Sequence, residues 1–167
     1  GLMEAVSGVD LLVHAAALKD VAACEAKPFD ASQVNIMGTQ NVARACIDAG
    51  VKRALLISTD KAVNPTSVYG ATKLCAERVF VAANFDRNHY RATRLAVVRF
   101  GNLAGTKGSA IPVLLAQRRK GTLRLTGPTM TRFWTSLDLA STFVLQCLES
   151  MEGGEAHMKK LVAFYGS

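Results

Sequence analysis

A tyrosine and a lysine four residues apart, in Tyr69-Gly-Ala-Thr-Lys73, are the strongest chemical signal in this sequence. Side chains at positions i and i+4 lie on one face of a helix. A nearby ammonium stabilises a phenolate, so we expect Lys73 to lower the pKa of Tyr69 from its usual value of about 10. Such a tyrosine can take the proton of a substrate hydroxyl while hydride leaves the same carbon. An ordinary surface pair is the alternative, but a strand end just before it, at Ser58-Thr59, favours the chemical interpretation.

Asp60 and Lys61 directly follow that strand end and place an acid beside a base. A general base must be neutral for part of the time, and desolvation or the charge of Lys73 would favour the neutral form of Lys61. A solvated acid–base pair in a loop is the alternative.

A glycine-rich segment runs from Gly101 to Gly108, after one predicted strand and before a predicted helix. By itself it resembles a loop that binds nucleotide phosphates, although one of its spacings departs from the known motifs. A simple glycine-rich turn is the alternative.

Apolar residues recur with two alternating periods, which predicts strands and helices in alternation. The predicted strands are 9–17, 53–58, 95–100 and 123–125, and the predicted helices are 28–49, 67–84, 110–119 and 137–149. The run 9–17 is typical of a strand buried on both faces. Short connections indicate an α/β fold with a mostly parallel sheet. Ligands of such sheets bind beyond the carboxyl ends of the strands, here after Ala17, Ser58 and Phe100.

The 167 residues, 50% hydrophobic and 20% charged, suffice for one domain with a sizeable core and exclude wholesale disorder. The charge is uneven, because residues 1–60 carry 5 basic and 7 acidic side chains and residues 61–167 carry 15 and 6. A basic second half suits an anionic partner such as a phosphorylated small molecule. The low aromatic content, 7%, and the lack of a long basic run argue against nucleic acid.

Four cysteines, Cys24, Cys46, Cys75 and Cys147, show no C-x-x-C spacing. Free thiols in a reducing compartment therefore fit better than disulfides or a metal site. No apolar stretch approaches the roughly 20 residues of a membrane span, and no signal peptide opens the chain. We expect a cytoplasmic protein with no metal, no nucleic-acid partner and no membrane partner.

Together, Ser58-Thr59 and Tyr69-x-x-x-Lys73 resemble the motifs of the extended short-chain dehydrogenase/reductase superfamily. The stretch Ser-Thr-Asp-Lys-Ala-Val-Asn-Pro at 58–65 is similar to nucleotide-sugar 4,6-dehydratases that act on UDP-N-acetylglucosamine. The similarity continues through HAAALKDV, NIMGTQNV, VYGATKLCAE, VVRFGNLAGTKGSAIP and MTRFW, over nearly all of residues 10–155. Tyr69, where some membrane-anchored relatives carry Met, favours the small soluble inverting enzymes that begin pseudaminic acid synthesis.

The resemblance implies a role for each matching residue. Tyr69, with Thr59 and Lys73, would deprotonate the sugar 4-hydroxyl as hydride passes to NADP⁺. Lys61 would then take the C5 proton, and Asp60 would protonate the departing 6-hydroxyl. Retaining relatives carry Asp-Glu at this place, so Lys61 implies inversion at C5. The implied contacts of the NADP cofactor are Ala15, Leu103, Tyr69 and Lys73. The implied contacts of UDP-N-acetylglucosamine are Lys19, Asn102, Lys107 and Arg132.

Two features depart from the family pattern. No G-x-x-G-x-x-G, the turn that holds the cofactor pyrophosphate, occurs before residue 10. Residues 156–167 do not match the family, and they resemble either a short unrelated tail or the first strand of a flavodoxin-like protein. The resemblance therefore implies a partial NAD(P)-binding Rossmann fold in residues 1–155, a doubly wound parallel sheet that lacks its first strands.

Three functions remain as hypotheses. The first is a segment of an inverting nucleotide-sugar dehydratase, a family whose full-length members form homo-oligomers. The second is a UDP-N-acetylglucosamine 4-epimerase of the same superfamily, which needs the Tyr69–Lys73 pair but not Asp60-Lys61. The third is an inactive fragment that retains only weak nucleotide binding.

Overall fold

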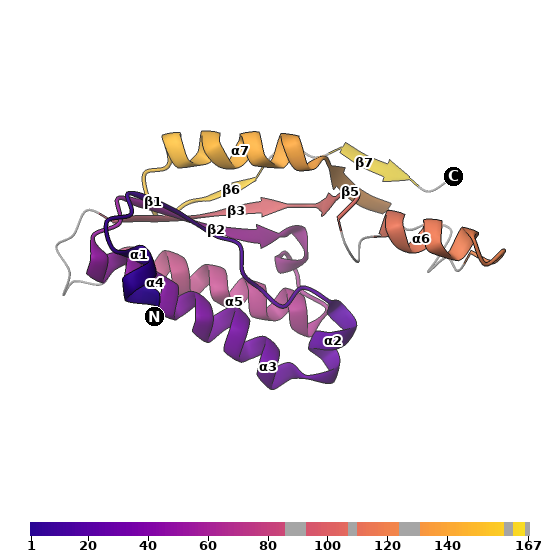
Figure 1. The fold of residues 1–167 in the computed structure, drawn as a ribbon, viewed down its shortest axis with the longest axis horizontal. Helices are drawn as coiled ribbons and strands as arrows, with labels where there is room; N and C mark the ends of the chain where they lie inside the picture. The colour runs from indigo at the N-terminus through magenta and orange to yellow at the C-terminus, as the bar shows by residue number, and fades with distance from the viewer. Residues whose placement is uncertain (86–92, 107–109, 124–130, 159–161, 166–167) are drawn as a thin grey trace.

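Four parallel strands form the main sheet, and helices lie on both of its faces (Figure 1). The strands are β1 (Leu11–His14), β2 (Arg53–Thr59), β3 (Arg94–Phe100) and β6 (Ala156–Met158), in the order β1-β2-β3-β6. This architecture confirms the predicted α/β fold with a parallel sheet. The structure is a computed structural model that describes residues 1–85, 93–106, 110–123, 131–158 and 162–165.

The core is formed on both sides of β2 and β3, because alternate side chains of a strand point to opposite faces. Leu56 and Val97 pack against the helices on one side. Leu55 and Val98 pack against the helix on the other side. All four are fully buried, and each such burial contributes about 1.5–3 kcal/mol. These two central strands therefore hold the residues at their carboxyl ends in fixed positions.

The helices of the first side are α1 (Leu2–Val6), α2 (Val21–Ala26), α3 (Pro28–Ser32), α4 (Gly38–Ala49) and α5 (Val68–Ala82); α7 (Leu137–Ser150) covers the other side (Figure 1). The predicted helix 28–49 is continuous, but α3 passes into α4 through a π-helical turn at Gln33–Met37. It ends at Gly50, whose φ of 73° lies in the left-handed region. α5 begins after Ser67, whose hydroxyl accepts a hydrogen bond from Gly70 N, and is followed by a 3₁₀ turn at Ala83–Phe85.

Strand β1 differs from its prediction, which gave a longer strand buried on both faces. Leu11 is 52% exposed and Val13 is 43% exposed. The reason is that, among the described residues, β1 pairs with β2 alone, and α7 packs mainly on β2 and β3. One face of β1 therefore lies open, while its other face packs against α4.

A second, smaller sheet lies beyond the carboxyl ends of the main strands. It contains β4 (Asn102–Leu103), β5 (Thr131–Thr135) and β7 (Val162–Tyr165), with β5 parallel to β4 and antiparallel to β7. α6 (Ala110–Arg118) projects at the same end (Figure 1). The predicted strand 123–125 is wrong at Leu123, which is irregular, and its other two residues lie outside the described ranges. Residues 156–158, which we expected in a separate tail, form β6 and complete the main sheet.

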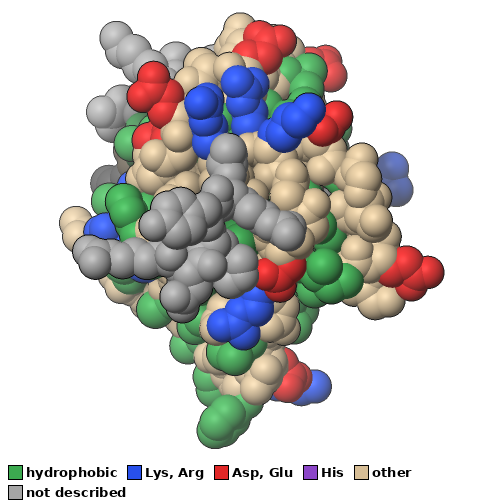
Figure 2. Space-filling view, turned by 90° about the vertical axis from the view of Figure 1, so that its left-hand side faces the viewer, with side chains coloured by type: hydrophobic (Ala, Val, Ile, Leu, Met, Phe, Trp, Pro, Cys, Tyr) green, Lys and Arg blue, Asp and Glu red, His purple; other side chains and the backbone are tan. Residues whose placement is uncertain are grey.

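The opposite end of the molecule, seen in Figure 2, carries charged side chains of both signs. Lys52 forms an ion pair with Asp10 at 2.9 Å. Arg53 donates to the carbonyl of Leu148 at 2.9 Å, so this cation ties the amino end of β2 to α7. These groups hold elements together, far from the carboxyl ends of the strands.

Candidate active site

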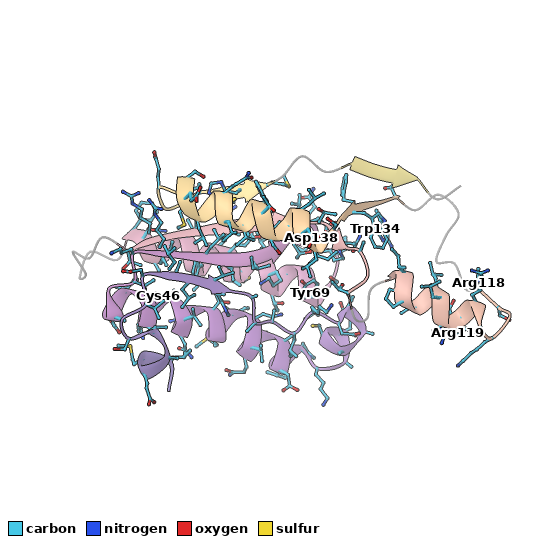
Figure 3. The ribbon with its side chains drawn as sticks, turned by 45° about the horizontal axis from the view of Figure 1, so that its top comes forward. Cys46, Tyr69, Arg118, Arg119, Trp134 and Asp138 are labelled. Atoms are coloured by element: carbon cyan, nitrogen blue, oxygen red, sulfur yellow. The ribbon has the colours of Figure 1, made fainter. Side chains whose placement is uncertain are left out.

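A cleft of about 610 Å³ opens where the carboxyl ends of β1, β2 and β3 meet. It is lined by Ala15 and Lys19 after β1, Thr59 and Lys61 after β2, Asn102 and Leu103 after β3, and Tyr69 and Lys73 on α5. Figure 3 shows Tyr69 toward the same end of the molecule as Trp134 and Asp138, with Arg118 and Arg119 at the far end of α6. The three strand ends named from the sequence therefore converge on one site.

Tyr69 and Lys73 both face this cleft, but their electrostatics differ from the prediction. Burial raises the pKa of Tyr69, a hydrogen bond with the Thr59 side chain opposes that rise, and the charge of Asp60 adds to it. Lys73 is 2% exposed, and its Nζ donates to the carbonyl of Ile57 at 2.8 Å. The expected lowering of the tyrosine pKa by Lys73 is therefore wrong for this arrangement, because burial outweighs the stabilising contacts.

Lys73 lies beside a buried carboxylate, Glu77, to which the sequence motifs give no role. Burial lowers the pKa of Lys73 to about 8, and the charge of Glu77 opposes that shift. Glu77 accepts two hydrogen bonds from Arg99, at 3.0 and 2.6 Å, and a third from Ser58 at 2.5 Å. The i and i+4 spacing of Lys73 and Glu77 was visible in the sequence, whereas the pairing with Arg99 depends on the contact between α5 and β3.

Asp60 and Lys61 lie in a 3₁₀ turn, Asp60–Ala62, that begins directly at the end of β2. Thr59 Oγ1 caps this turn by accepting from Lys61 N at 3.3 Å, and it donates to Asp60 Oδ1 at 3.0 Å. Lys61 Nζ donates to Asp60 Oδ1 at 3.0 Å and to Asn102 Oδ1 at 3.2 Å. The amide of Asn102 also donates to the carbonyl of Phe133, at 3.3 Å. An acid, a base and an amide thus form one hydrogen-bonded set beside Tyr69.

Gly70 allows α5 to start against this turn. A Cβ at position 70 would overlap the carbonyl oxygen of Lys61 and would approach the side chain of Pro65 to 3.1 Å. Tyr69 and Lys61 therefore reach the same cleft because a glycine lies between the helix start and the turn.

Asn35 is a further site residue that the sequence interpretation missed. Its side chain, 1% exposed, accepts from Leu18 N at 2.8 Å and donates to Leu18 O and to Thr72 Oγ1, each at 3.0 Å. These bonds tie the loop after β1 to α5 through the π-helical turn. A polar residue between Val34 and Ile36 was the available sequence signal, because apolar helix faces seldom bury an asparagine without partners.

His14 extends this network at the end of β1. Its Nε2 lies 3.1 Å from Thr39 Oγ1, and Thr39 Oγ1 donates to the carbonyl of Asn35 at 2.7 Å. Burial, together with the charge of Lys73, lowers the pKa of His14 to about 4. Because the Thr39 hydroxyl proton is used toward Asn35, the neutral imidazole of His14 donates from Nε2.

Comparison with protein families decides where this arrangement belongs. A family described as polysaccharide biosynthesis protein matches residues 2–164. The chain belongs to this family, within the extended short-chain dehydrogenases/reductases. The match runs past Glu155, where we expected the resemblance to end.

Two curated members are similar to this chain over nearly all of its length. The UDP-N-acetylglucosamine 4,6-dehydratase (inverting) of Campylobacter jejuni subsp. jejuni serotype O:23/36 (strain 81-176) is 45% identical over 163 residues, 96% of this chain and 48% of that protein. The UDP-glucose 4-epimerase of Rickettsia canadensis (strain McKiel) is 39% identical over 158 residues, 94% of this chain and 46% of that protein. The chain thus spans about half the length of the curated relatives it matches.

Solved structures agree with this family fold. The X-ray structure of Pen from Bacillus thuringiensis aligns with a TM-score of 0.94 at 36% identity, over 98% of this chain and 52% of that one. A double mutant of DesIV, a dTDP-glucose 4,6-dehydratase from Streptomyces venezuelae solved with NAD and DAU bound, aligns with a TM-score of 0.84 at 25% identity, over 94% of this chain and 53% of that one. The sheet and its helices therefore have the NAD-binding fold of dehydratases and epimerases.

Two residues that the family resemblance named lie apart from the cleft or outside the described ranges. Arg132, on β5, is exposed, does not line the cleft, and donates to the carbonyl of Thr131 at 2.8 Å. Lys107 lies in the stretch 107–109, which the structure does not describe. Over the described ranges, no cluster of three or more His, Cys, Asp or Glu side chains could hold a metal ion. Within those ranges no helix is both long and apolar enough to span a bilayer.

Proposed function

We propose that this chain is the part of an inverting UDP-N-acetylglucosamine 4,6-dehydratase that carries its catalytic side chains. The observation that carries the proposal is the position of Lys61 at the cleft that Tyr69 also lines, with its Nζ 3.0 Å from Asp60 Oδ1. Dehydration needs an acid and a base in addition to the Tyr69–Lys73 pair, and these two groups supply them. The 45% identity to an inverting dehydratase supports the same conclusion. By the same resemblance, we propose a cytoplasmic homo-oligomer that acts in a pathway of the pseudaminic acid type.

Part of the cleft lining suits a nicotinamide cofactor. Ala15 and Ala17 line it with small side chains, which let a flat ring or a ribose approach the backbone after β1. Leu103 offers an apolar contact, and Tyr69 and Lys73 offer a hydroxyl and an ammonium. When bound, the nicotinamide supplies a hydride acceptor for C4 of the sugar and a hydride donor for C6. We propose NADP, and NAD⁺ is the necessary comparison because NAD is bound in the DesIV structure.

Tyr69 opens the reaction by taking the proton of the sugar 4-hydroxyl. Its phenolate must be stabilised against the burial that raises its pKa. Thr59 would do so by turning its hydroxyl proton from Asp60 Oδ1 to the phenolate oxygen, and Lys73 lines the same cleft with a positive charge. We assign Lys19 and Asn102 to the sugar nucleotide, because both line the cleft and offer a cation and an amide. Lys107 and Arg132 are further candidates for its phosphates.

The elimination requires Lys61 without a proton and Asp60 with one. Transfer of a single proton across their 3.0 Å hydrogen bond produces both states at once. Lys61 then removes the C5 proton, which the 4-ketone has made acidic, and Asp60 protonates the 6-hydroxyl so that water leaves. Return of the proton by Lys61 to the opposite face inverts C5. Lys61 ends neutral and Tyr69 protonated, and exchange with solvent restores the starting states.

The whole protein that contains this chain provides the test, with UDP-N-acetylglucosamine and either NADP⁺ or NAD⁺. We expect a UDP-4-keto-6-deoxy sugar with inverted C5, identified by NMR, and deuterium at C5 when the reaction runs in heavy water. A purified, folded protein that forms no such product with either cofactor would contradict the proposal.

Epimerisation at C4 is the second candidate, favoured by the 39% identity to a UDP-glucose 4-epimerase over 94% of this chain. It would use Tyr69 and Lys73 and would leave Asp60 and Lys61 without a chemical role. The same incubation separates the two functions, because an epimerase would form UDP-N-acetylgalactosamine and no keto sugar.

A further inference from the structure

A buried carboxylate that the proposed reaction does not use lies behind the cleft. Glu77, on α5, is 4% exposed. Arg99, on β3, donates to it from Nε at 3.0 Å and from Nη2 at 2.6 Å, and Ser58, on β2, donates at 2.5 Å. One carboxylate therefore joins the helix that carries Tyr69 to both central strands.

Lys73 is a second cation, on the same face of α5 as Glu77. It lies one helical turn before Glu77, is 2% exposed, and has the carbonyl of Ile57 as a hydrogen-bond acceptor at 2.8 Å. A buried ammonium without a counter-charge tends to lose its proton, because desolvation penalises the charged form. Burial does lower the pKa of Lys73, to about 8, and Glu77 opposes this shift.

We propose that Glu77 is a positioning residue for the Tyr69–Lys73 pair: its carboxylate keeps Lys73 in the ammonium form and, through Arg99 and Ser58, fixes α5 against the strand ends. The inference rests on the proposed function, since it concerns the groups that would remove the 4-hydroxyl proton. A purely structural ion pair would hold α5 in place and would leave the protonation of Lys73 unchanged.

The other charged groups near Lys73 do not replace Glu77. His14, on β1, is neutral near neutral pH because burial and Lys73 lower its pKa to about 4. Asp60 and Lys61, after β2, are paired with each other at 3.0 Å. Arg99 adds positive charge from β3. The charged side chains of α5 and of the helices beside it are exposed or partly exposed and are screened by solvent: Asp20, Glu25, Asp30, Arg44, Asp48 and Arg78.

The protonation of Lys73 is measured directly by NMR in the whole protein that contains this chain, with ¹³Cε-labelled lysine and Lys73→Arg to identify the signal. We expect Glu77→Gln to lower the titration midpoint of Lys73 by about one to three pH units. Because this change leaves Arg99 buried without its partner, Glu77→Gln/Arg99→Met removes both ends of the pair. The loss of the Arg99 charge by itself favours the ammonium, so we expect the double variant to lower the Lys73 midpoint by less than Glu77→Gln, and Arg99→Met alone to raise it. Glu149→Gln, an exposed carboxylate on α7, is the matched control. An unchanged Lys73 midpoint in folded Glu77→Gln, or in both the double variant and Arg99→Met, overturns the proposal.

The consequence for the reaction is measured in the whole protein, from the absorbance of reduced nicotinamide in the first hydride transfer. We expect the alkaline fall in the rate of this transfer to move to lower pH in the Glu77 variants, by the same amount as the Lys73 midpoint. It should not move in Glu149→Gln. A wild-type protein that never reduces the cofactor with a UDP-sugar would refute the proposed function, while the NMR titration would still decide the role of Glu77. A pH profile that stays in place although the Lys73 midpoint moves would refute its part in the reaction.

Discussion

Tyr69 and Lys61 act at different steps of the proposed reaction, although both side chains reach the same cleft. In the whole protein, we expect Lys61→Ala to retain the first hydride transfer and to slow elimination by about 10²–10⁴, the usual contribution of a general base. Tyr69→Phe removes the acceptor for the 4-hydroxyl proton, so it should block hydride transfer itself. Stopped-flow measurement of the absorbance of reduced nicotinamide separates the two variants. Reduced nicotinamide should accumulate in Lys61→Ala and stay absent in Tyr69→Phe.

Lys52→Ala is the matched control, since this exposed lysine pairs with Asp10 at the opposite end of the sheet. The reverse pattern of accumulation would exchange the roles of Tyr69 and Lys61. Lys61→Glu creates the Asp-Glu pair of retaining relatives, and normal turnover of that variant with the same C5 stereochemistry would remove Lys61 from the mechanism.

The buried imidazole of His14 should make stability depend on pH. Its pKa of about 4 in the folded chain lies below the usual value of 6.5, so the unfolded chain binds the proton more tightly. Stability is therefore complete above the unfolded pKa and is lost as pH falls toward the folded pKa, by up to about 3 kcal/mol. Urea unfolding at about pH 7.5 and about pH 5 should show this loss, and His14→Gln should reduce it. The assignment to His14 would be wrong if His14→Gln lost as much stability at low pH as the wild type does. It would also be wrong if the control His157→Gln reduced that loss as much as His14→Gln.

Residues that belong to chemical motifs could be identified from the sequence, whereas residues that only support them could not. Tyr69 and Lys61 were found because their types and spacing have chemical meaning. Glu77 and Asn35 were missed because their partners, Arg99 and Leu18, are distant in sequence and meet them only in the fold. The pKa of Tyr69 was predicted in the wrong direction, since spacing shows neither the depth of burial nor the acceptor of the Lys73 ammonium.

Among the elements, the start of α5 is the most constrained, because Gly70 packs directly on the turn that carries Lys61. We expect Gly70→Ala to lower the free energy of unfolding by about 1–3 kcal/mol, as overpacking does, and to displace the turn. Gly38→Ala is the matched control: position 38 is also helical, its nearest atom would lie at 3.6 Å, and alanine should stabilise by up to about 1 kcal/mol. Urea unfolding measures both, and equal effects of the two changes would show that the contact at Gly70 is not restrictive.

The type of an element could be predicted where its apolar residues recur with a single period, as in β2, β3, α5 and α7. The π-helical turn at Gln33–Met37 could not be predicted, because apolar residues keep their helical spacing throughout 28–49. The buried side chain of Asn35, within this turn, hydrogen-bonds with Thr72. β5 was also missed, since its burial pattern is mostly exposed and its strand conformation depends on pairing with β4 and β7.

For the whole molecule, the open edge at β1 decides how the isolated 167-residue chain behaves. In the part of the chain that the structure describes, β1 has one strand neighbour, and Leu11 and Val13 on β1 expose apolar surface. Unpaired backbone groups next to apolar side chains invite pairing with another chain. We therefore expect this chain by itself to self-associate or to be poorly stable, to bind NADP⁺ very weakly, and not to turn over UDP-N-acetylglucosamine.

Light scattering after size-exclusion chromatography tests this expectation, with Val13→Lys as the variant that places a charge on the edge. Lysine on an edge strand opposes strand addition, so Val13→Lys should shift the distribution toward monomer. Leu145→Lys, at a 62% exposed leucine on α7, makes the same chemical change away from the edge and should leave association unchanged. Dissociation by Leu145→Lys alone would place the contact on α7. A wild-type monomer that binds NADP⁺ with micromolar affinity in calorimetry would refute the expectation, and would point to the glycine-rich segment 101–108 as the phosphate-binding loop.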